Sequence, residues 1–156
     1  MVFWTTLLIV HGLLAVALLG AVTHQAVALW WPVRAPAGSF VARFRAVPGV
    51  SYVWAVIILY IVTFIMGAWI YTQYRFTSRL ALEQLRFLKT VGAFEVKEHV
   101  ATIGLIVLPA YWAFWRRPLS ADYAAARKQV TLLLALLVWA SFLVGHIVNN
   151  ARGFGS

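Results

Sequence analysis

Four stretches of this chain contain no Asp, Glu, Lys or Arg, and they constrain its fold more than any other feature. Three of them, 1–33, 46–74 and 129–151, are 33, 29 and 23 residues long. About 20 predominantly apolar residues are enough for a helix to cross the hydrocarbon of a bilayer. The fourth stretch, 100–115, has 16 residues, so we expect its helix to begin nearer Phe94. Because the bilayer core holds no water to satisfy the backbone, each segment should be helical.

The sequence therefore predicts an all-α integral membrane protein, a single domain over residues 1–156 in a four-transmembrane-helix bundle. No positive charge precedes Arg34, so we expect the first segment to be retained rather than removed as a signal peptide. The segment Thr77–Thr90 lacks Gly and Pro and is rich in Leu, which predicts a short amphipathic interfacial helix. The four predicted spans are Val2–Trp31, Ser51–Tyr71, Phe94–Trp115 and Val130–Asn149.

The composition excludes several classes of function. Charged residues make up 11% of the chain, against about 25% in an ordinary soluble domain. The absence of cysteine rules out disulfides, iron–sulfur clusters, c-type haem attachment and zinc–thiolate sites. The net charge of +9 is spread over three loops and a tail, which is typical of membrane edges. We therefore expect a lipid bilayer around the protein and no nucleic acid as a partner.

Four spans place the N-terminus, the second connection and the C-terminus on one side of the membrane, here called side A. The first and third connections lie on the opposite side, side B. Side A carries six Lys and Arg residues and side B carries seven. Because the positive charge is denser in the short loops of side B, these loops are expected in the cytoplasm. The expected location is the bacterial inner membrane.

Four histidines stand out among the few polar residues of the spans: His11, His24, His99 and His146. An ionisable residue inside a membrane span indicates a functional site by default. The topology places three of them in the half of the bilayer nearest side A, and leaves His24 alone near side B as a candidate for a second site. The three side-A histidines could ligate a b-type haem, bind another transition metal, relay protons, or only hydrogen-bond between helices.

The neighbours of two histidines favour haem. Gly12 follows His11 and Gly145 precedes His146, and residues without a Cβ allow a flat macrocycle to approach a helix backbone closely. Three cations near side A are candidates to contact a haem propionate: Arg75, Arg79 and Lys97. Three residues at the end of the last span could contact a haem propionate or a quinone oxygen, or could only cap the helix end at the headgroups: Asn149, Asn150 and Arg152.

A carboxylate also precedes the third side-A histidine. Glu95 lies four residues before His99 and could orient its imidazole through the second ring nitrogen. An interfacial carboxylate in water is the favoured explanation. Glu98, next to Lys97, is also expected to be solvated at the interface.

In helix number and histidine placement, the whole chain resembles the four-helix membrane cytochromes b. This class includes the cytochrome b561-type electron carriers and the haem-bearing anchor subunits of respiratory dehydrogenases. The resemblance implies a haem b whose iron is held by some pair of His11, His99 and His146, and electron transfer between quinone and a partner redox protein. His11 and His24 are separated by about 220° around an ideal helix, so they are not expected to serve two stacked haems on one helix.

A different class of function remains open. Loops this short leave no room for a soluble catalytic domain, so the chain could be a cofactor-free accessory or scaffold subunit of a respiratory or photosynthetic membrane complex. Its histidines would then serve packing and hydrogen bonding. Both interpretations predict other membrane subunits or partner proteins, and they differ in whether the purified protein is coloured.

Overall fold

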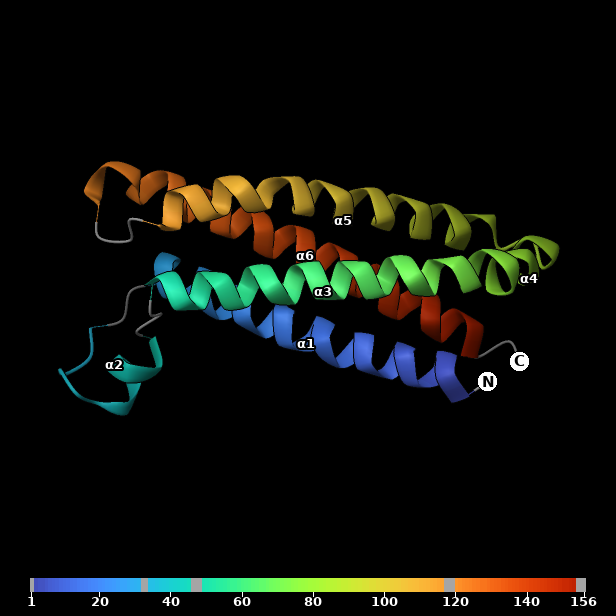
Figure 1. The fold of residues 1–156 in the computed structure, drawn as a ribbon, viewed down its shortest axis with the longest axis horizontal. Coiled ribbons are helices and arrows are strands. Elements are labelled where there is room, and N and C mark those ends of the chain that lie inside the picture. Colours follow the sequence, from blue (N-terminus) through green and yellow to red (C-terminus); the bar gives the residue numbers. More distant parts are fainter. Residues whose placement is uncertain (1, 32–33, 46–48, 117–119, 154–156) are drawn as a thin grey trace.

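The computed structural model describes residues 2–31, 34–45, 49–116 and 120–153, and nearly all of them are helical. Four long helices, α1, α3, α5 and α6, lie side by side in an elongated bundle (Figure 1). The short helix α4 joins α3 to α5 at the end of the bundle where α1 begins and α6 ends. The helix bounds are α1 Val2–Trp30, α2 Phe40–Arg45, α3 Gly49–Phe76, α4 Ser78–Gln84, α5 Leu88–Trp115 and α6 Ala124–Gly153, with a 3-10 turn at Ala121–Tyr123 before α6.

The all-α class is confirmed for the described residues, which contain no strand. Within them, three helical segments are long and apolar enough to cross a membrane: Val2–Trp30, Ser51–Phe76 and Ala121–Asn150. The 28 residues of α5 match these in length, but Glu95, Lys97 and Glu98 interrupt the apolar character of its first half. The number of spans shown by length and composition is therefore three.

Three long helices extend beyond the predicted spans. Helix α3 continues to Phe76, α5 begins at Leu88 rather than Phe94, and α6 begins at Ala124 rather than Val130. Backbone hydrogen bonding within a helix does not require hydrocarbon, so a helix need not end where the apolar sequence ends. The short helix α2 lies in the first connection, for which the sequence predicted no helix.

The predicted interfacial helix Thr77–Thr90 is divided in the structure. Helix α4 ends at Gln84, and residues 88–90 belong to α5. At Arg86 the backbone adopts φ +59°, in the left-handed region that favours glycine, and the Phe87 N–H returns to the Leu82 carbonyl at 2.8 Å. The chain thus reverses at a non-glycine residue, which a search for Gly and Pro does not detect.

The main hydrophobic core fills the side-B half of the bundle and reaches its middle. Val22, Val56, Tyr111 and Leu134 are completely buried there. Polar groups within this core are paired across helices: the Tyr111 hydroxyl donates to Gln25 Oε1, and the Trp115 indole donates to Thr131 Oγ1 at 2.9 Å. These contacts tie α5 to α1 and α6.

A smaller cluster closes the side-A end. Leu82 of α4 packs there with Tyr74, Val91 and Val148 from the three helices α3, α5 and α6. Between this cluster and the main core lies a cavity lined by all four long helices, and it is the candidate functional site.

Candidate functional site

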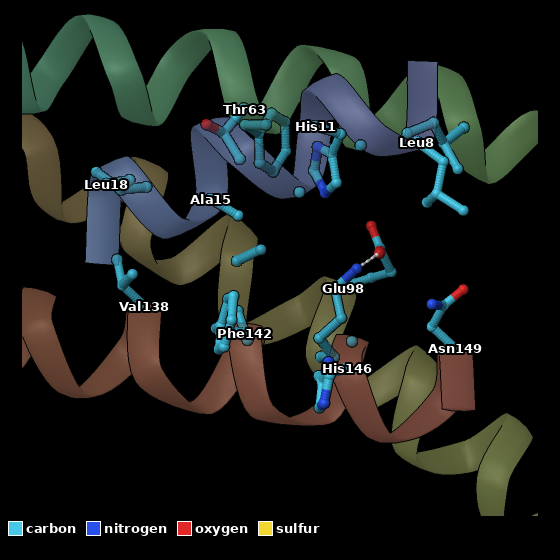
Figure 2. Close-up of a pocket in the computed structure, with 18 of the residues that line it drawn as sticks. Leu8, His11, Ala15, Leu18, Thr63, Glu98, Val138, Phe142, His146 and Asn149 are labelled. Atoms are coloured by element: carbon cyan, nitrogen blue, oxygen red, sulfur yellow. Dashed lines mark hydrogen bonds and ion pairs between the residues drawn. The ribbon is translucent and has the colours of Figure 1, made fainter. Parts of the chain in front are cut away.

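A cavity of about 270 Å³ opens between α1, α3, α5 and α6 in the half of the bundle nearer α4. Figure 2 shows its walls, with His11 on α1 facing α6, which carries His146. All four long helices contribute small residues to the lining, and these create the space: Gly12, Ala15, Gly67, Ala101, Ser141 and Gly145. Two of the three side-A histidines and both glycines singled out in the sequence therefore meet at one cavity.

His11 is held by the backbone of α3. A Cβ on Gly67 would lie 3.1 Å from Cε1 of the imidazole, so the glycine allows the ring to rest directly against that helix. His11 Nδ1 is buried and has no hydrogen-bond partner among the described residues. A buried polar atom without a partner is uncommon, because its desolvation is not compensated. This nitrogen is available to a group that enters the cavity.

His146 lines the cavity from α6 but is more exposed. Its ring stacks on Phe142, with centroids 6.2 Å apart and planes 2° apart. Its Nε2 lies 3.0 Å from Asn150 Nδ2, which makes Nε2 the acceptor and leaves the ring proton on Nδ1. For Nε2 to bind a metal, the contact with Asn150 has to be released.

The third side-A histidine, His99, does not line the cavity. It is exposed on α5, and its Nδ1 donates to the Glu95 carbonyl oxygen at 2.7 Å. The Glu95 carboxylate instead pairs with Arg79 Nη1 at 3.0 Å, so Glu95 contacts His99 through its backbone and not through its side chain. Arg75 is exposed and is not among the residues that line the cavity.

An ion pair forms part of the cavity wall. Lys97 Nζ pairs with Glu98 Oε1, and both residues line the cavity (Figure 2). Their side chains are 14% and 28% exposed, so Glu98 is partly shielded by the bundle and is paired with a cation. The lysine ammonium also lies 4.4 Å from the centroid of the Phe94 ring. The signal in the sequence was the spacing of Phe94, Lys97, Glu98 and Ala101, which places all four on one helical face.

Two hydroxyl groups add to the unpaired polar atoms of the lining. Thr63 of α3 is 9% exposed, and Ser141 lies on α6. Both hydroxyl oxygens are buried without a hydrogen-bond partner within the described part of the chain, and both residues line the cavity. Their sequence context does not distinguish them, because an isolated Ser or Thr in a span is common between packed helices. Together with His11 Nδ1, they supply three unpaired polar atoms around one apolar space.

His24 lies outside this cavity, toward the opposite end of α1. Its ring stacks on Phe44 of α2 with centroids 4.6 Å apart, and its Nδ1 is 3.5 Å from the Tyr52 hydroxyl. The structure therefore places His24 in a separate environment from His11. The side chain of Arg152, a candidate from the sequence, lies outside the described residues.

Metal sites made only of protein ligands are not evident. Over residues 2–31, 34–45, 49–116 and 120–153, no group of three or more His, Asp or Glu side chains is arranged to hold a metal ion. A haem iron needs fewer protein ligands than such a metal ion, since the macrocycle supplies four ligands and the protein supplies one or two. The cavity offers two imidazoles for that purpose.

Comparison with known proteins found no matching family model, no similar curated protein and no similar solved structure.

Proposed function

We propose that this chain is a membrane b-type cytochrome that crosses the bilayer four times and passes electrons between quinone and a partner redox protein. In this proposal α5 is the fourth span, and the first and third connections face the cytoplasm of a bacterial inner membrane. A haem b would be held in the cavity by His11 and His146, which would bind its iron. The observation that carries the proposal is the meeting of these two histidines, each beside a glycine, at one cavity within the span region.

The cavity lining supports a flat apolar group. Gly12 and Gly145 have no heavy atom within 4 Å of where a Cβ would stand, so the helix backbones border open space there. Phe64 and Phe142 also line the cavity and provide aromatic surface for the faces or edges of a macrocycle. The volume of 270 Å³ is close to the lower end of about 300 Å³ for pockets that hold drug-sized ligands. A haem is larger than this volume, so only part of the macrocycle would lie in the cavity and the rest would extend beyond it.

The polar residues have distinct roles in the proposal. Bound haem supplies the one-electron chemistry, while axial ligands, burial and nearby charge set its potential. Lys97 is the cation of the cavity wall, and together with Asn149 it is placed to contact a propionate near side A. His146 would hold the iron through Nε2, in place of the contact of that nitrogen with Asn150. His99 has no role, because it lies on the outer surface of α5.

Visible spectroscopy tests this proposal. The detergent-purified protein, expressed with haem supplied, should show an oxidised-to-reduced difference spectrum of a b-type haem on addition of dithionite. His11→Ala and His146→Ala should each abolish or strongly reduce the haem content measured as the pyridine haemochrome. His99→Ala is the matched control, since it removes a histidine of the same half-bilayer that does not face the cavity, and it should leave the haem content unchanged.

Two results would contradict the proposal. A folded, colourless protein after expression with excess haem would exclude the cytochrome. Equal loss of haem in all three alanine variants would remove the assignment of His11 and His146 as the axial pair.

A second candidate function uses the same cavity for a quinone without haem. The unpaired hydroxyls of Thr63 and Ser141 are suited to donate hydrogen bonds to quinone carbonyl oxygens, and the cavity volume suits a single ring. In that case the purified protein is colourless, and solvent extraction yields quinone from the unmodified chain but less from a Thr63→Val, Ser141→Ala variant.

A further inference from the structure

Helix α4 packs on the end of the bundle with one side only. Ser78 and Leu82 face inward and are 7% and 4% exposed, and Leu82 belongs to the small cluster at the side-A end. Arg79 holds α4 to α5 through its ion pair with Glu95. The opposite side of the segment faces outward, next to the end of α3, a helix of membrane-spanning length.

That outward side is unusually apolar. Leu80, Leu85, Phe87 and Leu88 are 50%, 59%, 52% and 65% exposed. Four large apolar side chains within nine residues form a surface that a water-exposed connection rarely carries. This surface follows directly after Phe76, the last residue of α3, which is a helix long and apolar enough to cross a membrane. An interfacial segment places such side chains at the boundary of headgroups and acyl chains.

Cations without partners accompany these apolar residues. Arg75, Arg86 and Lys89 are exposed, and no carboxylate of the described residues forms an ion pair with any of them. The two nearby carboxylates, Glu83 and Glu95, both pair with Arg79. The four cations and two carboxylates of this region leave a net charge of +2, and its electrostatic complement is a surface of negative charge.

The backbone conformation of Arg86 also favours contact of its side chain with an anion. Its φ of +59° lies where glycine is the least strained residue. An arginine at this turn places a long cationic side chain on the outward side at some conformational cost. A side chain that contacts a fixed anion would offset that cost.

We propose that the exposed side chains of residues 75–89, here called the α4 face, bind the anionic headgroup layer of the adjacent leaflet. The apolar side chains enter the upper acyl region, and Arg75, Arg86 and Lys89 contact lipid phosphates. The chemical class of the ligand is an anionic phospholipid such as phosphatidylglycerol. This inference does not depend on haem or quinone in the cavity.

Native mass spectrometry of the full chain in a neutral detergent tests the proposal, with phosphatidylglycerol or phosphatidylcholine titrated as probe. The unmodified chain should retain phosphatidylglycerol in preference to phosphatidylcholine. The triple variant Arg75→Gln, Arg86→Gln, Lys89→Gln should bind phosphatidylglycerol more weakly by on the order of 100-fold, since each Lys or Arg near an anionic surface contributes about fivefold. A matched variant at the opposite end, Arg34→Gln, Arg43→Gln, Arg116→Gln, should keep the preference.

A single substitution separates charge from folding. Arg86→Gly removes one cation and relaxes the left-handed backbone, so it should lower phosphatidylglycerol binding about fivefold without lowering the Tm. The proposal fails if the unmodified chain binds both lipids equally, or if the matched variant loses the preference as fully as the triple variant. It also fails if Arg86→Gly leaves binding unchanged, or if inorganic phosphate competes with the lipid at equal concentration, which would indicate a simple anion site.

Discussion

The phenol of Tyr60 crosses from α3 to the backbone of α5 at Gly104. A Cβ on Gly104 would lie 1.9 Å from the Tyr60 hydroxyl oxygen, and that hydroxyl donates to the Ala101 carbonyl at 2.8 Å. At Gly67 the nearest neighbour of the Cβ position is 3.1 Å away. Tyr60 thus joins the two helices at the boundary between the main core and the cavity.

Gly104→Ala should therefore be strongly destabilising. The new methyl group displaces the Tyr60 ring and removes its hydrogen bond, and such overpacking costs about 1–3 kcal/mol. Gly92→Ala is the control on the same helix, because no atom lies within 4 Å of its Cβ position, and it should be neutral or slightly stabilising. The measurement is the Tm in detergent. A Tm for Gly104→Ala at or above that of Gly92→Ala would show that Tyr60 does not hold this position.

Gly12→Ala and Gly145→Ala should have different effects on the haem-free protein and on the protein with bound haem. In the absence of a ligand each added methyl group meets open space, so the Tm of the haem-free form should stay the same or rise. With haem in the cavity the methyl groups occupy space required by the macrocycle, and the haem content per polypeptide should fall. Full haem occupancy in both variants would place the haem away from these two backbones.

The hydrogen bond between Tyr111 and Gln25 should be worth more than an average bond between membrane helices. Such bonds average about 0.6 kcal/mol. Gln25 is completely buried, and its amide nitrogen has no partner among the described residues. Removal of the Tyr111 hydroxyl therefore leaves the whole amide unpaired. We expect Tyr111→Phe to destabilise the protein toward the upper limit of about 1.7 kcal/mol.

Thr23→Val provides the comparison for Tyr111→Phe. It removes the hydrogen bond from Trp139 Nε1 to Thr23 Oγ1, which joins α1 to α6 at a more exposed position with a length of 2.9 Å. Denaturant unfolding in mixed micelles measures both. A smaller loss for Tyr111→Phe than for Thr23→Val would contradict the expected importance of burial.

Glu95→Gln should loosen α4 without unfolding the bundle. The hydrogen bond with Glu83 raises the pKa of Arg79 above its usual value, so Arg79 stays charged and keeps one partner when Glu95 is neutralised. Amide hydrogen exchange over residues 78–84 should become faster, while exchange in α1 and α6 stays as before. Unchanged exchange over 78–84 would mean that Leu82 alone holds α4 in place.

The sequence predicted the long helices well because a run of apolar residues in a chain of this composition has few alternatives to a helix. It also placed His11 and His146 in the same half of the bundle from chain direction alone. It did not predict that His99 points outward while Lys97 and Glu98 face the cavity. The depth of a residue along the bundle follows from the order and direction of the helices. The side of the helix on which that residue lies relative to the cavity depends on the packing of all four helices, and successive residues point about 100° apart around the axis.

The same reasoning explains the division of the segment 77–90. Its apolar residues fit one helix, but the chain must reverse direction to bring α5 back along α3. The reversal falls at Arg86, whose left-handed backbone is an unusual choice for arginine. The turn in this segment therefore results from the packing of α4 and α5 and not from a Gly or Pro in the sequence.

The position of the main core has a consequence for biogenesis. Its completely buried members, such as Val22, Val56 and Leu134, lie toward side B, and they pack without contribution from the open end of the cavity. The helices can therefore assemble in the membrane first, and whatever fills the cavity can be loaded afterwards. Under the proposed function, insertion of the polypeptide and delivery of its haem would then be separate events.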